Sequence, residues 1–173
     1  MDKLTIIAGI LFFSSDVFAI ASLAHPDWIN TEDRAGAYTL GLTKQCQKIY
    51  GRRESTCFFP TLPPEWVASL FFLTAGIACL SVTCILVGLS HWYRSMLMYA
   101  RWVAFGGIDC LCQVGILFPI GFRQDVVGGE VYRLPEVWGL GDSYKIFWVF
   151  AVILSCSGCC ILMMPMRIWI LNR

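Results

Sequence analysis

The residues best suited to chemistry in this chain are its nine cysteines, which fall into two groups. Cys46 and Cys57 lie in one polar loop, outside the long apolar segments. A disulfide between them would be worth about 2–3 kcal/mol in the chain-entropy model. We predict this disulfide, as a staple that holds a surface. The other seven cysteines lie within the apolar segments, where the expected role is that of a small packing residue: Cys79, Cys84, Cys110, Cys112, Cys156, Cys159 and Cys160.

Two carboxylates interrupt the apolar segments and are the second candidate for chemistry. Asp16 adjoins Ser14 and Ser15, and Asp109 lies four residues before Gln113. A carboxylate inside a membrane is costly and usually marks a partner or a pathway. Three interpretations stay open: a hydrogen-bonded residue that fixes helix packing, a docking point for another protein's transmembrane helix, and an ion or proton path. The third lacks a basic partner inside the membrane.

The depth of the two aspartates in the membrane and the residues beside them bear on the docking interpretation. Counted from the cytoplasmic ends of their segments, Asp16 is about 18 Å deep and Asp109 about 11 Å deep, so the two are not expected to pair. Gly106 and Gly107 lie beside Asp109. Small residues let helices approach closely. We therefore take all four residues as candidates for docking a partner.

The patterns of known enzymes are absent from the sequence. There is no G-x-S-x-G, H-E-x-x-H, P-loop or Rossmann glycine motif. The only histidines, His25 and His91, are expected at opposite faces of the membrane, whereas a zinc site needs about four converging ligands. An aspartyl enzyme needs two carboxylates at one site, and Asp16 and Asp109 look offset in depth. We expect no enzyme, no metal and no other cofactor.

Membrane-spanning helices must position these residues. The chain is 57% hydrophobic and 14% charged, whereas a soluble domain carries about 25% charged residues. The net charge of +1 gives no basis for nucleic-acid binding. Four segments reach the roughly 20 apolar residues that cross a bilayer, and they are 4–24, 66–90, 102–122 and 146–166. The fold class expected is an all-α membrane protein, a four-helix bundle in one domain over residues 1–173.

The first segment has an alternative interpretation as a cleaved signal peptide. Ser22-Leu23-Ala24 has the small-x-small ending of a cleavage site, and Lys3 supplies a weak positive start. Asp16 and the length of the apolar run favour a retained span.

Orientation follows from the loops. We expect both termini in the cytoplasm, with extracellular loops at 25–65 and 123–145. Only 5 of the 13 Lys and Arg residues then lie inside, which opposes the positive-inside rule. The oxidising compartment that a Cys46–Cys57 disulfide needs favours this orientation. The expected location is the plasma membrane, with endosomal vesicles as a further site.

The first loop holds most of the expected soluble structure. Residues 37–43 are rich in Tyr, Thr and Leu and favour a strand, and a second strand is expected around 57–59, with Gly51 in a turn between them. A basic cluster lies near that turn and is either a solvated face or a docking patch for an acidic extracellular partner. Its members are Lys44, Lys48, Arg52 and Arg53. The second loop is expected to form turns and a short strand around 131–132.

Four spans with a larger first loop resemble the claudin and peripheral-myelin-protein superfamily, whose mark is W…G-L-W…C…C. The matching residues are Trp28, Gly41, Leu42, Cys46 and Cys57. Thr43 stands where the family has a second tryptophan. The resemblance implies a claudin-like fold, with a small disulfide-stapled extracellular sheet on the bundle. The tail 171–173 lacks the PDZ-binding end typical of junctional claudins, which argues against assembly of tight-junction strands.

The attenuators of Hedgehog, also called modulators of Smoothened, are a closer resemblance. The similar segments are 1–7, 26–31, 62–66, 100–102 and 118–122. This resemblance implies negative regulation of Hedgehog signalling, in which a single-pass receptor-like adaptor and a RING ubiquitin ligase lower surface Smoothened. The rival interpretations are a claudin-like adhesion or barrier protein and an auxiliary subunit of an ion channel.

Overall fold

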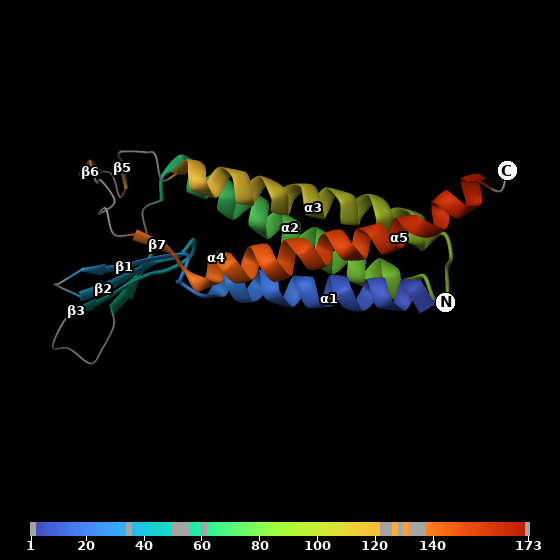
Figure 1. Ribbon diagram of the computed structural model, residues 1–173, viewed down its shortest axis with the longest axis horizontal. Helices are drawn as coiled ribbons and strands as arrows, with labels where there is room; N and C mark the ends of the chain where they lie inside the picture. Colours follow the sequence, from blue (N-terminus) through green and yellow to red (C-terminus); the bar gives the residue numbers. More distant parts are fainter. Residues whose placement is uncertain are drawn as a thin grey trace.

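A bundle of long helices with a small sheet at one end is the architecture of the computed structural model (Figure 1). The structure describes residues 3–33, 36–49, 56–59, 62–121, 126–127, 130–131 and 138–171. Four segments are long and apolar enough to cross a membrane, which confirms the four predicted spans. They are α1 (Lys3–Ala24), α2 (Pro64–Leu89), α3 (Met96–Ile120) and the segment Asp142–Met163.

All four helices begin earlier than the predicted spans, two of them by four residues or more. The helix α3 begins at Met96 rather than 102, because a tight turn after α2 is closed by backbone hydrogen bonds such as Trp92 N to Leu89 O at 3.0 Å. The last span begins at Asp142 rather than 146. It runs without a break through α4 (Asp142–Ile146), the π-helix η2 (Phe147–Val152) and α5 (Ile153–Leu171). Backbone hydrogen bonds extend a helix beyond its apolar run, so hydropathy alone places helix ends poorly.

Glycines bring α2 and α3 together. A Cβ added to Gly107 would lie 3.0 Å from the Cβ of Cys79, and one added to Gly76 would lie 2.8 Å from a methyl group of Leu111. Gly106 is exposed, and an added Cβ there meets nothing within 4 Å. The adjacent glycines therefore differ: Gly107 is a packing residue, and Gly106 lies on the outer surface of the bundle.

Buried hydroxyls join α1 to the last span. Ser15 Oγ donates a hydrogen bond to the carbonyl of Ala151 at 2.7 Å, and Ser155 Oγ donates to the same carbonyl at 2.6 Å. All three residues are buried. Ala151 belongs to η2, and π-helical segments disturb the regular backbone ladder of a helix. The two serines satisfy a carbonyl inside the bundle, where water is absent.

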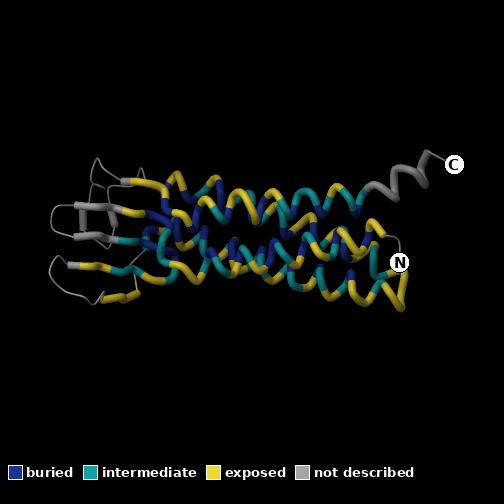
Figure 2. The backbone as a smooth tube through the Cα atoms, turned by 60° about the horizontal axis from the view of Figure 1, so that its bottom comes forward, coloured by how far each residue is buried: buried dark blue, intermediate teal, exposed yellow. Residues whose placement is uncertain are grey.

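A hydrogen bond that is lost at a proline in α3 is replaced by a side chain of the last span. Pro119 has no N–H group, so the carbonyl of Gly115 loses its donor within the helix. The Tyr144 hydroxyl donates a long hydrogen bond of 3.5 Å to that carbonyl. Gly115 also has no room for a Cβ, because the Trp148 ring lies against it. The buried residues lie on the inner sides of the helices and at the junction with the sheet (Figure 2).

The sheet is antiparallel, with five strands in the order β4-β3-β2-β1-β7. Its strands are β1 (Ile29–Asp33), β2 (Gly36–Leu40), β3 (Gln45–Ile49), β4 (Thr56–Phe58) and β7 (Trp138–Leu140). The expected strands at 37–43 and 57–59 correspond to β2, which ends three residues earlier, and to β4. The strands β1 and β3 were missed, because their polar sequences INTED and QCQKI lack a clear alternation.

The second loop contributes more strand than expected. Its strand β7 joins the sheet through β1, with Ile29 opposite Leu140. A separate pair, β5 (Val126–Val127) and β6 (Glu130–Val131), covers part of the short strand expected around 131–132. Gly51 with its turn and Tyr132 lie outside the described residues.

The adjacent glycines of α3 give a matched test of the packing. We expect Gly107→Leu to lower the free energy of unfolding by about 1–3 kcal/mol, because the side chain overpacks the contact with α2. Gly106→Leu should not lower it, because the position is open and leucine favours a helix more than glycine does. Thermal unfolding of the detergent-solubilised chain would measure both. Equal destabilisation by the two substitutions would contradict the assignment of the two faces.

Candidate functional site

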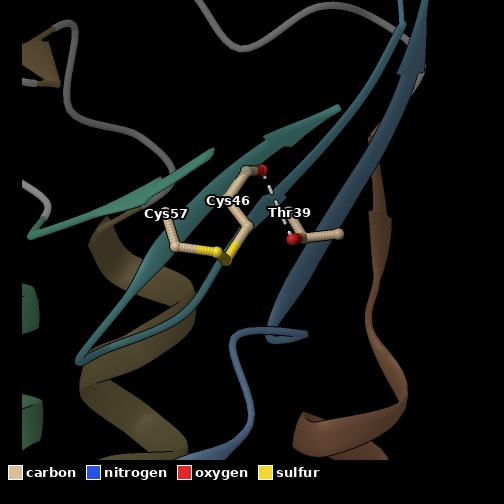
Figure 3. The surroundings of a disulfide bond; sticks show 3 residues. All are labelled: Thr39, Cys46 and Cys57. Carbon is tan, nitrogen blue, oxygen red and sulfur yellow. Dashed lines mark hydrogen bonds between the residues drawn. A yellow bond between two sulfur atoms is a disulfide. The ribbon is translucent and has the colours of Figure 1, made fainter. Parts of the chain in front are cut away.

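The predicted disulfide is present and fastens one edge of the sheet. Cys46 of β3 lies directly opposite Cys57 of β4, and the two sulfurs are bonded at 2.05 Å (Figure 3). On the other side of β3, Thr39 Oγ donates to the Cys46 carbonyl at 3.4 Å. The strand β4 is at the edge of the sheet and has only three residues, which is the short end of the usual strand length. The disulfide therefore keeps the edge strand on the sheet.

Trp28 anchors the sheet in the bundle. Its side chain is 0% exposed and lies against Phe118, Tyr144 and Phe147, with ring centroids 4.9, 5.8 and 5.7 Å away. The indole Nε1 donates a hydrogen bond of 2.7 Å to the carbonyl of Ser22, near the end of α1. A buried tryptophan needs such a partner for its N–H. One side chain thus contacts α1, α3 and the last span.

The residues after β2 complete this anchor. An added Cβ at Gly41 would lie 2.6 Å from the Cα of Pro26, so the two chain segments touch as backbone. Leu42 is 1% exposed. Thr43, which stands where claudins have a second tryptophan, donates a hydrogen bond of 3.0 Å to the Leu23 carbonyl. That carbonyl is among the last four of α1, which have no donor within the helix. The hydroxyl thereby ties the sheet to the end of α1.

The second loop reaches the same point. The Gly141 N–H donates to the Trp28 carbonyl at 2.9 Å, and the Ser143 N–H donates to the Asp27 carbonyl at 3.1 Å. Gly141 lies so close to the Asp27 backbone that a Cβ would not fit. We call Trp28, Gly41, Thr43 and Gly141 the sheet junction. It joins both loops to the bundle and sets the orientation of the sheet.

Asp16 faces the inside of the bundle. The Ser81 hydroxyl of α2 donates a hydrogen bond of 2.7 Å to its Oδ2, and the residue is 9% exposed. Its Oδ1 has no hydrogen-bond partner within the described part of the chain. This arrangement favours the helix-packing interpretation of Asp16, because the carboxyl group links α1 to α2 and is covered by the chain itself.

Asp109 has the opposite environment. It is exposed on α3, and none of the residues that the structure describes forms a hydrogen bond or ion pair with its carboxylate. It lies 13 residues after Met96, about 20 Å along the helix. The predicted depth of about 11 Å is counted from 102, where the apolar run begins, and it stays a prediction, because the helix start at Met96 does not mark the membrane surface. Asp16 lies equally far, 13 residues, after the start of α1. The two carboxylates do not meet, because Asp16 faces the inside of the bundle and Asp109 lies on its outer surface.

Only part of the basic cluster can be placed. Lys44 and Lys48 are exposed, and Lys48 lies in β3 opposite Ala37 of β2. Arg52 and Arg53 lie outside the described residues. A docking patch here stays a prediction.

No metal centre is formed within the described ranges, where no group of three or more His, Cys, Asp or Glu residues is positioned to hold an ion. Sequence reasoning missed the roles of Ser81, Thr43 and Tyr144. The available signal was weak in each case, because it was a single hydroxyl in or beside an apolar segment.

Four membrane-length apolar helices and a disulfide-stapled sheet define a multi-pass membrane protein. The family model described as Attenuator of Hedgehog matches residues 25–164, which span the sheet, α2, α3 and most of the last span. The chain belongs to this family, whose description assigns its members to attenuation of Hedgehog signalling. The resemblance found in the sequence is thereby confirmed. Claudin-likeness stays a prediction.

The contact at Gly41 gives a second matched pair. We expect Gly41→Ala to lower the free energy of unfolding by about 1–3 kcal/mol, because the methyl group must displace backbone at Pro26. Gly139→Ala in β7 should be tolerated, since the nearest atom to an added Cβ there is the Asn30 carbonyl oxygen at 3.9 Å. Thermal unfolding with the disulfide intact is the measurement. A Gly41→Ala chain as stable as Gly139→Ala would refute the close contact.

The Asp16 hydrogen bond can be tested in the same way. We expect Ser81→Ala to destabilise the chain by about 1–3 kcal/mol, because it leaves a second carboxyl oxygen of Asp16 buried without a partner. Ser157→Ala is the control, because that hydroxyl bonds only within its own helix, to the Ile153 carbonyl at 2.9 Å. Unfolding in detergent would compare them. A cost no larger than that of the control would rule out a stabilising bond.

Proposed function

We propose that this chain is a membrane adaptor that attenuates Hedgehog signalling by lowering the amount of Smoothened at the cell surface. It acts through a single-pass receptor-like adaptor and a recruited RING ubiquitin ligase. The observation that carries the proposal is family membership over residues 25–164. The architecture supports a binding role, because the chain presents a disulfide-stapled sheet at one end of the helix bundle.

Ubiquitin transfer must come from another protein in this scheme. The end of the bundle away from the sheet carries the start of α1, the end of α5 and the α2–α3 connection (Figure 1). That connection runs from Ser90 to Ser95, between the bounds of α2 and α3. A short turn of this kind offers a contact for a partner but no enzymatic fold.

The proposed orientation places the sheet outside the cell and both termini in the cytoplasm of a plasma-membrane or endosomal protein. The Cys46–Cys57 disulfide supports it, because disulfides persist in oxidising compartments. The sheet would then meet the ectodomain of the receptor-like adaptor. Exposed Lys44 and Lys48 would favour an acidic surface on that ectodomain.

Adhesion between neighbouring membranes is a second candidate function. Phe58 and Phe59, at the end of β4, are 49% and 87% exposed. Large apolar side chains exposed beside a disulfide-held edge strand are typical of a contact surface. A barrier or adhesion protein would concentrate at cell–cell contacts, whereas a modulator of Smoothened would spread over the surface and internal vesicles. Imaging the tagged chain therefore separates the two functions.

The decisive experiment measures surface Smoothened after the gene is deleted and then restored. We expect surface Smoothened to rise on deletion and to return with the wild-type chain. Restoration with Cys46→Ser/Cys57→Ser should fail, because the edge strand of the sheet is no longer held. It should also lose co-purification with the receptor-like adaptor.

The matched control for the disulfide is Cys160→Ser, because Cys160 is an exposed cysteine without a disulfide. This variant should restore surface Smoothened fully. Unchanged surface Smoothened on deletion would sink the proposed function. Full rescue by the double serine variant, with normal binding, would remove the stapled sheet from the mechanism.

A further inference from the structure

One face of α3 carries a carboxylate and an amide where a lipid-facing helix is expected to be apolar. Residues three or four positions apart lie on the same side of a helix. Five residues of α3 have this spacing, and they are Trp102, Gly106, Asp109, Gln113 and Ile116. Four of them are exposed and Gln113 is half-buried. We call these five residues the Asp109 stripe. It runs along the outer surface of the bundle, through the middle of a membrane span.

Internal packing does not account for Asp109. The other intramembrane carboxylate, Asp16, is buried and receives a hydrogen bond from Ser81. Asp109 is exposed, and no such contact reaches it from the described residues. A carboxylate that faces hydrocarbon without a partner is costly, and such residues pair with another group or mark a site. Within the described part of the chain no group pairs with the Asp109 carboxylate, which points to a partner outside the bundle.

We propose that the Asp109 stripe docks a single transmembrane helix of another protein, and that this helix carries a lysine or arginine near the bilayer centre. Charge complementarity selects the partner, because a cation at the same depth satisfies the carboxylate within the hydrocarbon. Gly106, one turn from Asp109, lets the partner backbone approach closely. The absence of any atom within 4 Å of an added Cβ at Gly106 shows that the approach is open.

A second copy of this chain does not fit the same face. Within the four spans, the lysines and arginines are Lys3, Arg101 and Lys145, and each lies near a span end. None lies in the middle of a span, where a second copy would need a cation to pair with Asp109. Two Asp109 stripes placed face to face would bring like charges together, which is unfavourable in a medium of low dielectric constant. The occupant is therefore a different protein with one suitable helix.

This inference deepens the proposed function by naming the membrane contact through which the chain would recruit a single-pass partner, and it rests on that function only for the partner's identity. The binding chemistry stands separately. It can be tested with purified components, so that a failure of docking and a failure of the Hedgehog role give different results.

The test uses the full chain, fused to a fluorescent protein, in phosphatidylcholine liposomes. The probe is a labelled alanine–leucine helix with one lysine at its centre, and energy transfer reports association. The same helix with leucine or with glutamate at that position serves for comparison. We expect the lysine helix to associate about tenfold more tightly than the leucine helix, which is the scale of a strong polar contact between membrane helices.

Variants locate the contact. Asp109→Asn should remove the preference for lysine to within about twofold, whereas Asp109→Glu should keep it, because the charge remains. Gly106→Leu should weaken binding of the lysine helix about fivefold or more by blocking the approach. Gly88→Leu is the matched control, because Gly88 of α2 is also exposed with nothing within 4 Å of an added Cβ. It should leave binding unchanged.

Several outcomes would overturn the inference. Equal association of the lysine and leucine helices would exclude a cationic partner. Equal association of the lysine and glutamate helices would exclude charge complementarity. Retention of the lysine preference by Asp109→Asn would place the contact elsewhere. A Hedgehog role that fails in the deletion experiment leaves a positive liposome result intact, because the liposomes contain neither Smoothened nor a ligase.

Discussion

The buried indole of Trp28 holds the two parts of this molecule together. It lies against aromatic rings from α3 and the last span, and its N–H bonds a carbonyl near the end of α1. The backbone around it receives the Gly141 N–H from the second loop. Large aromatic side chains bury much apolar area with few rotatable bonds. The sheet is consequently attached to three helical segments through one residue. At the far edge of the sheet, the Cys46–Cys57 disulfide links β4 to β3.

The membrane part obeys a second constraint, which is that polar groups without water must find partners inside the protein. Ser15 and Ser155 share the Ala151 carbonyl, Ser81 bonds Asp16, and Tyr144 reaches the carbonyl that Pro119 leaves without a donor. These contacts connect neighbouring helices at several depths. Asp109 is the exception among them, since it lies on the outer surface. Asp16 therefore helps to build the bundle, whereas Asp109 is the carboxylate that we propose to meet a partner.

The family and the architecture are both compatible with the proposed role as an adaptor. The chain has a sheet at one end, helices with large apolar side chains on their outer surfaces and a short turn between α2 and α3. Membership in the Attenuator of Hedgehog family directs that role to one signalling pathway. The proposed scheme divides recognition between the sheet, outside the membrane, and the Asp109 stripe within it. Two contacts made by one chain with the same partner bind more tightly together than either does alone.

Apolar runs and the placement of cysteines determined the outline of this protein by themselves. Four spans follow from segment length because a bilayer has a set thickness, and Cys46–Cys57 follows because no other cysteines lie outside the spans. Tertiary structure decided the rest. The strands β1 and β3 form by pairing with neighbouring strands, and their polar sequences do not predict this pairing. Gly106 differs from Gly107, and Asp109 from Asp16, because rotation about a helix axis is set by packing against other helices. Hydropathy measures how apolar a segment is, and only the packed bundle decides which side of it faces inward.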